Sequence, residues 1–231
     1  MATALCLAFL AHPAAAQDVS GCNSWPDVPV NLQPVFDEPK TDFSQNLAAI
    51  QLIASDRQHS IPQYHAITMG ITSYRPVLEF RVPIVVQEEP DGLSCAYVQH
   101  VDVTLGYRDV TVFIASEIPQ GTCAFDETMA HEQKHIAVNQ NILEEFAPLI
   151  EERFKAYLKL NGVSRVQNPD YAKQLITERL KSIMDEVVDQ MIAENMRRQR
   201  EVDSTDEYAR LSRVCNGELS SIADRYRRLG P

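Results

Sequence analysis

The chain changes character at Pro119, and this change limits the folds open to it. Before Pro119, runs rich in Val, Ile, Thr, Phe and Tyr alternate in hydropathy, most clearly at Val101-Asp102-Val103-Thr104-Leu105, as half-buried strands do. After it, apolar residues recur every three, four or seven positions, as on one face of a helix. Strands followed by helices predict an α+β domain with a small antiparallel sheet followed by long helices.

The part of the chain before Pro119 predicts one short helix and four antiparallel strands. The helix is expected at 43–54, and the strands at 65–72, 78–86, 95–105 and 109–115. Glu89-Pro90-Asp91-Gly92 is a turn signal between two of the strands. We expect the last strand to be the sheet edge that pairs with an extended peptide.

Three helices are predicted after Pro119, at 124–159, 168–200 and 204–214. Asn161-Gly162 ends the first, and Asn168-Pro169 is an N-cap followed by proline at the first helical position of the second. Ser204 or Thr205 is a candidate N-cap for the third. Because the intervening coil segments are short, residues 17–231 are expected to form a single domain.

Composition excludes two classes of partner. With 231 residues, 45% of them apolar, the chain is long enough to bury a sizeable core. Lys and Arg total 21 against 32 Asp and Glu, for a formal charge of -11, so the surface would repel a nucleic-acid backbone. No apolar run reaches the length of a transmembrane segment, so none is expected in the mature chain. The sequence does not decide the oligomeric state.

The N-terminus predicts export. Residues 2–10 are apolar, and Ala14-Ala15-Ala16 before Gln17 is the small-residue pattern at which signal peptidase cuts, so residues 1–16 are interpreted as a signal peptide. Val19-Ser20-Gly21-Cys22 is similar to a lipoprotein box, but polar residues separate it from the apolar run. The expected location is periplasmic or extracellular.

The cysteines fit an oxidising compartment. Loss of the signal peptide removes Cys6 and leaves Cys22, Cys95, Cys123 and Cys215, an even number. Four cysteines allow three pairings; we favour Cys95 with Cys123 and Cys22 with Cys215. No C-x-x-C spacing supports the alternative of a cysteine metal site.

His131-Glu132-Gln133-Lys134-His135 lies inside the first long predicted helix. Residues four apart share one helix face, so both imidazoles can bind one cation, and neutral imidazole is a good Zn²⁺ ligand. Glu132 is rotated by about 100° from His131, which lets its carboxylate reach a water on the metal without occupying a coordination position. Zinc peptidases use this arrangement. The alternative is two solvated histidines on a helix surface.

The third zinc ligand must come from another element. The metzincin pattern would place Gly at position 138 and His or Asp at 141, where this chain has Val138 and Asn141. If the helix continues, Glu145 lies about 15 Å beyond His135 along its axis. A second helix supplies a glutamate in gluzincins. The candidate donors here are Glu178, Asp185, Glu186, Asp189, Glu194, Asp203, Asp206, Glu207 and, on the strands, His65 and His100.

A family resemblance ranks these candidates. Over 64–211, the chain resembles an uncharacterised bacterial family described as predicted secreted zinc-dependent proteases. The resemblance rests on the order of Cys95, Val110-Thr111-Val112-Phe113, Ile118-Pro119, Cys123, the His131–His135 motif and Asp203-Ser204-Thr205. The family has Asp, Thr and then His-Gly in the late segment, where this chain reads Thr205-Asp206-Glu207-Tyr208. If that family's late His binds metal, the resemblance implies Glu207 as the third ligand, since carboxylates also bind zinc.

Three neighbouring residues have candidate supporting roles. Glu127 and Asp126 lie about one turn before His131, where either carboxylate can accept a hydrogen bond from a ligand histidine or, for Asp126, cap the helix. Thr128 is an equal capping candidate. Tyr208 can stabilise the oxyanion that develops during attack on a carbonyl, or simply pack.

These patterns lead to two hypotheses of different class. The first is a secreted or periplasmic zinc-dependent hydrolase of zincin type, a metallopeptidase acting on peptides or proteins, in which Zn²⁺ on His131, His135 and Glu207 activates a water and Glu132 is the general base. The second is a non-catalytic exported module of the cell envelope, whose histidines bind a structural metal or none.

Overall fold

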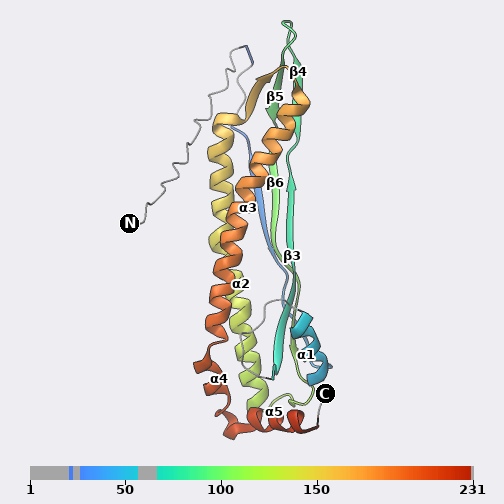
Figure 1. Ribbon diagram of the computed structural model, residues 1–231, viewed down its shortest axis with the longest axis vertical. Coiled ribbons are helices and arrows are strands. Elements are labelled where there is room, and N and C mark those ends of the chain that lie inside the picture. The colour runs from blue at the N-terminus through green and yellow to red at the C-terminus, as the bar shows by residue number, and fades with distance from the viewer. Residues whose placement is uncertain (1–20, 23–26, 57–66, 230–231) are drawn as a thin grey trace, which may run out of the picture.

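Two long helices lie side by side along one face of an extended sheet (Figure 1). They are α2 (Cys123–Asn161) and α3 (Pro169–Val202), and they run in opposite directions along the molecule. At 39 residues, α2 is about 58 Å long. The computed structural model describes residues 21–22, 27–56 and 67–229, so the predicted signal peptide and His65 lie outside the described residues.

The main sheet is built around one long strand, β6 (Val101–Ile114). β3 (Gly70–Arg81) pairs antiparallel along one side of β6, while β1 (Val30–Phe36) and β2 (Lys40–Asp42) pair parallel with successive parts of β6. The prediction of four antiparallel strands is therefore wrong for this sheet, since β1 and β2 were not foreseen. The prediction that 109–115 forms an edge is also wrong, because neighbours occupy both sides of β6.

A second, antiparallel sheet lies at the opposite end of the molecule from α1 (Leu47–Asp56) and α5 (Glu218–Leu229) (Figure 1). It contains β4 (Ile84–Glu88), β5 (Ser94–Val98) and β7 (Val163–Val166), which connects α2 to α3. The predicted strands 78–86 and 95–105 each divide between the two sheets, because the chain breaks at Pro83 and again between β5 and β6.

A bulge keeps the same face of β6 buried along its length. Val101 to Tyr107 are buried at every second position, and burial resumes at the even positions Val110, Val112 and Ile114. Asp109 has a left-handed φ of 54°. Two residues of β6 face one residue of β3 here, as in a β-bulge. The extra residue changes the alternation by one, and the apolar side chains stay on the helix side.

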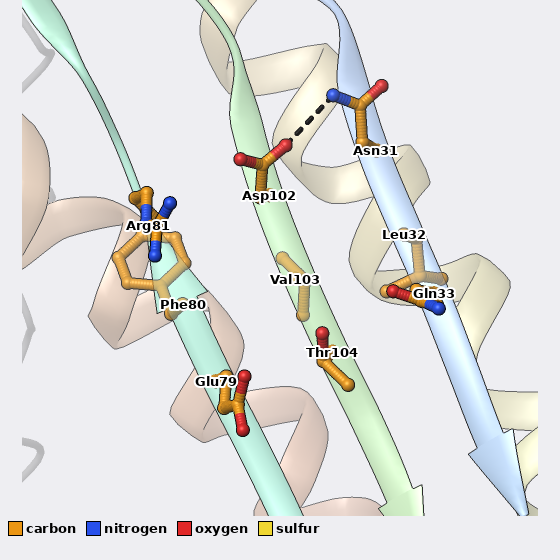
Figure 2. Close-up of a pocket in the computed structure, with 9 residues that line it drawn as sticks. All are labelled: Asn31, Leu32, Gln33, Glu79, Phe80, Arg81, Asp102, Val103 and Thr104. Carbon is orange, nitrogen blue, oxygen red and sulfur yellow. Dashed lines mark hydrogen bonds between the residues drawn. The ribbon is translucent and has the colours of Figure 1, made fainter.

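Only one face of the main sheet is covered by the helices. The buried side contributes to two apolar clusters: one beneath α2 and α3, and one that includes α1 and α5. On the other face, β1, β3 and β6 form a hollow of about 360 Å³ (Figure 2). Its polar lining residues are Asn31, Gln33, Glu79, Arg81, Asp102 and Thr104. These include no histidine, so this hollow lacks the imidazoles of the predicted site.

The helix starts follow the expected capping chemistry. Asn168 caps α3 by accepting hydrogen bonds from the backbone N–H groups of Asp170 and Tyr171, and Ser204 caps α4 (Thr205–Leu211). Thr122 caps α2, in place of Asp126 or Thr128. After the 3-10 turn η1 (Cys215–Gly217), α5 adds a helix that was not predicted.

The two disulfides join Cys22 to Cys95 and Cys123 to Cys215, so the predicted pairing is wrong. β6 explains the difference. Its 14 residues extend over about 46 Å and separate Cys95, on β5 in the second sheet, from Cys123, at the start of α2. Each cysteine therefore pairs at its own end of the molecule. Two disulfides are compatible with the predicted export.

Within the described residues, no helix has the length and apolar character needed to cross a bilayer.

Candidate metal centre

His131 and His135 direct their Nε2 atoms toward one another. They lie one turn apart on α2, and their Nε2 atoms are 3.3 Å apart, with the rings at 85°. The side chains are 9% and 15% exposed. The sequence prediction that both imidazoles face one point is therefore confirmed, and the alternative of two solvated histidines is wrong.

Asp203 completes a triangle with the two histidines. Its Oδ1 is 3.3 Å from His131 Nε2 and 3.4 Å from His135 Nε2. Asp203 is the C-cap residue of α3, so the end of one long helix delivers a carboxylate to the motif on the other. Among the candidate donors that the structure describes, Asp203 is the one with contacts to the Nε2 atoms of both histidines.

The size of this triangle fits a divalent metal ion. Ligands at about 2.0–2.1 Å from a tetrahedral zinc are separated by about 3.3–3.4 Å. The three ligand-to-ligand distances of 3.3, 3.3 and 3.4 Å match this value. His131, Glu132 and His135 also offer ligand atoms within 4.8 Å of one another. The arrangement can therefore hold a metal with three protein ligands.

The opposite nitrogen of each ring is held by a residue from α3 or α4. His135 Nδ1 lies 2.5 Å from Gln199 Oε1, and His131 Nδ1 lies 3.5 Å from Glu207 Oε1. An amide oxygen and a carboxylate only accept hydrogen bonds, so both Nδ1 atoms are assigned as donors. Once Nε2 has lost its proton, each ring would have the tautomer that a metal requires, with the Nε2 lone pair facing the centre.

Glu207 does not lie where the resemblance implies. Its carboxylate faces the Nδ1 side of His131 and also accepts hydrogen bonds from Lys134 (2.6 Å) and Arg210 (2.9 Å). The Arg210 guanidinium and the Lys134 ammonium hold the pKa of Glu207 at about 2. The Glu207 carboxylate therefore lies on the outer side of His131 and is not part of the triangle around the two Nε2 atoms. Glu127, expected to have that role, instead accepts a hydrogen bond from Arg210.

Glu132 is buried against β3. One carboxylate oxygen accepts a 2.8 Å hydrogen bond from the Thr72 hydroxyl. Burial raises the pKa of Glu132 despite the opposing effect of the two histidines. Gly70 makes room for this side chain, since a Cβ there would lie 3.1 Å from Glu132 and 2.9 Å from Thr128. A basic carboxylate thus stands beside the two imidazoles.

Charges within the triangle favour a bound cation. Burial alone would raise the pKa of Asp203, but hydrogen bonds with His131 and His135 outweigh it and hold that pKa well below its usual range. Burial also opposes charge on His135, yet the hydrogen bond to Asp203 and the Glu132 carboxylate raise its pKa to about 9. In the metal-free protein, the proton on His135 therefore balances part of the negative charge of Asp203 and Glu132. A bound metal ion would balance that charge instead.

Tyr208 points its hydroxyl at Asp203. The hydroxyl donates a 3.1 Å hydrogen bond to Asp203 Oδ1, and the ring lies 6.3 Å from that of His131. Burial raises the pKa of Tyr208, so its proton is retained at neutral pH. The phenol is thus a fixed hydrogen-bond donor beside the centre.

Four of the other candidate donors form ion pairs away from the triangle. Asp185 pairs with Lys181, Glu186 with Arg153, and Glu194 with Arg197 and Arg198, as surface ion pairs do. His100 pairs with Asp102. The sequence signal for Asp203 was its position between two helices, directly before the N-cap Ser204. That position fixes the backbone around Asp203, but only the packing of α3 on α2 shows that its side chain faces the histidines.

The triangle lies in a cleft of about 550 Å³. Residues of α1, β3, α4 and α5 line this cleft together with the motif on α2 and the end of α3. A buried base, a metal-sized triangle and a donor hydroxyl therefore share one space large enough for part of a chain-like ligand.

No protein-family model, curated protein or solved structure matches this chain. Functional inference therefore depends on the geometry of the site.

Proposed function

We propose that this protein is an exported zinc-dependent peptidase. His131, His135 and Asp203 would hold the zinc ion, and Glu132 would be the general base. The observation that carries this proposal is the triangle of two Nε2 atoms and one carboxylate oxygen, with the size of a zinc ligand set and a buried carboxylate beside it.

The ligand types favour zinc. Two imidazoles and one carboxylate form a common catalytic zinc set, which leaves a fourth position for water or substrate. Sites for Mg²⁺ and Ca²⁺ are built mainly from oxygen ligands instead. The Nδ1 contacts to Gln199 and Glu207 would orient both imidazoles for binding.

Peptide hydrolysis requires a base for the attacking water, a hydrogen-bond donor for the carbonyl oxygen and a proton for the leaving amine. A zinc ion in this triangle would supply Lewis acidity that acidifies a water and polarises the scissile carbonyl. Glu132 would take a proton from that water as the water oxygen forms a bond to the carbonyl carbon. The same proton would then pass from Glu132 to the amide nitrogen as the C–N bond breaks.

The surroundings of Glu132 suit this role. Its raised pKa makes the carboxylate a stronger base, and the Thr72 hydroxyl holds it in place. On substrate binding, the Tyr208 hydroxyl would turn from Asp203, to which it now donates, and would donate its hydrogen bond to the negative charge developing on the carbonyl oxygen. The family resemblance implies a zincin-type fold, and the packing of the motif helix on a sheet supports that part of the proposal.

Replacing Glu132 with Gln tests this proposal. The amide occupies the same space but cannot accept the proton, so turnover of a peptide mixture should fall by about 100- to 10,000-fold. Zinc measured per chain should remain near that of the unchanged protein. Hydrolysis that survives the substitution in a preparation free of contaminating proteases would contradict the assigned base.

The non-catalytic alternative predicts a different zinc site. A structural zinc is closed by four protein ligands, whereas three side chains form the triangle within the described part of this chain. Metal-dependent hydrolysis by the unchanged protein, lost on chelation and restored by zinc, would favour the peptidase.

A further inference from the structure

The cleft that holds the metal centre also has an apolar part, lined by residues of α1, α4, α5 and the segment just before β3. We call this space the apolar arm; it is lined by Ala54, Ile67, Met69, Leu211, Leu219 and Ala223. Leu219 and Ala223 are buried, at 6% and 7% exposure, and form its wall on α5. The arm therefore offers a hydrocarbon surface in the same cavity as the catalytic groups.

The two walls of the apolar arm continue directly from the metal centre. Met69 directly precedes Gly70, the first residue of β3, whose missing side chain makes room for Glu132. On α4, Leu211 lies one turn after Tyr208, which binds Asp203. A substrate held at the triangle would therefore place its neighbouring side chain against these walls.

The walls are fixed to the rest of the protein. The Cys123–Cys215 disulfide joins the start of the motif helix to the turn before α5. On the other side, the side-chain amide of Gln51 on α1 donates a 2.8 Å hydrogen bond to the Thr68 carbonyl and accepts a 3.2 Å hydrogen bond from the Thr68 backbone N–H. A preformed pocket loses little entropy on binding and can select a side chain by its size.

We propose that the apolar arm binds a large aliphatic or aromatic side chain next to the scissile bond, so that the enzyme selects apolar peptide sites. This inference rests on the proposed zinc peptidase activity. Ala223 is the specificity-determining residue in this proposal, because its small side chain leaves space on the buried wall of α5.

Hydroxamate binding tests the apolar arm without requiring turnover. Zinc-loaded protein would be titrated by calorimetry with acetohydroxamate and with the hydroxamates of N-acetylglycine, N-acetylleucine and N-acetylphenylalanine. The hydroxamate group chelates the metal in all four probes, so differences report the side chain. The leucine probe should bind at least about tenfold more tightly than the glycine probe.

Two substitutions should change this preference in opposite directions. Ala223→Leu fills the arm, so the leucine-to-glycine affinity ratio should fall to about threefold or less. Met69→Ala enlarges the arm from the opposite wall, so the phenylalanine probe should gain about threefold or more over the leucine probe. Met69→Ala adds no bulk, so it tests the arm even if Ala223→Leu does not fold.

Ser221→Leu is the matched control, since it adds the same side chain at an exposed position of α5 outside the cleft. Its affinity ratio should equal that of the unchanged protein. Equal binding of the glycine and leucine probes to zinc-loaded protein would overturn the apolar arm while leaving the metal centre intact. Failure to bind both zinc and acetohydroxamate would overturn the proposed function and this inference with it.

Discussion

The two halves of α2 differ in the side chains that they bury, because buried polar residues occur only in the first. From Cys123 to Asn139 the helix buries four polar residues beside Ala124 and Ile136, whereas from Ile142 to Leu158 its buried residues are all apolar; the four polar residues are Thr128, His131, Glu132 and Asn139. Buried polar groups lower stability unless they are paired, and apolar burial raises it. The apolar second half of α2 therefore stabilises the packing of α2 on α3. The first half depends on this packing, because it places residues of α3 and α4 beside the two histidines.

Removing Asp203 should have the largest effect on zinc affinity at the first half of α2, where the two histidines lie. Asp203→Ala deletes one of three proposed ligands, so zinc affinity should fall by well over 100-fold. Glu207→Gln changes only a hydrogen-bond partner of His131, for which a loss of about 10- to 100-fold is expected. Competition with a chromophoric chelator measures both. Equal losses, or a larger loss for Glu207→Gln, would show that the ligands are misassigned.

The apolar half should respond in stability and not in metal affinity. Phe154 is fully buried and packs against Phe80, with ring centroids 5.8 Å apart. Phe154→Ala should lower the free energy of unfolding by about 3–5 kcal/mol. Urea denaturation of the metal-free protein measures this change. If zinc affinity also fell more than about threefold under native conditions, the two halves would not be separable.

The two disulfides allow a matched comparison of the molecule's ends. They close loops of similar length, with sequence separations of 73 and 92, so removing either by paired Cys→Ser substitution should cost about 2–4 kcal/mol. Only loss of Cys123–Cys215 should also weaken binding of the leucine hydroxamate, because that disulfide holds α5. Calorimetry on both paired variants, below their unfolding temperatures, distinguishes the ends.

The smallest expected effect concerns the orientation of His135. Gln199 accepts from His135 Nδ1 and donates to Asn139 Oδ1 at 3.0 Å, and Asn139 in turn accepts from Asn195 at 2.8 Å. Asn139 thereby fixes which end of the Gln199 amide faces the histidine. Gln199→Leu should lower zinc affinity by about tenfold. Nitrogen chemical shifts of His135 should show a mixture of tautomers, whereas a purely packing role would leave them unchanged.

Local signals predicted the elements better than their arrangement. Asn168 and Ser204 cap the predicted helices because capping depends on a few adjacent residues. The strand 95–105 was not divided correctly because both β5 and β6 have strand-forming residues, and the break between them follows from tertiary packing. The parallel pairing of β1 and β2 is likewise a long-range feature that hydropathy does not encode.

The candidate site shows the same division. His131, Glu132 and His135 were identified because their spacing on one helix fixes their relative positions. Asp203 is 68 residues beyond His135 in the chain, so its approach depends on how α3 packs against α2. The disulfide pairing failed for a related reason, because the sequence did not reveal how far β6 separates the ends of the molecule.

Asp203 and Glu207 contact opposite nitrogens of the same imidazole from either side of the Ser204 cap. The single turn that joins α3 to α4 therefore fixes the spacing between the two carboxylates, which are four positions apart in the chain. Inserting one residue after Ser204 would retain every side chain named in the site. It would nevertheless rotate Glu207 by about 100° relative to Asp203, so the two carboxylates would no longer contact His131 together.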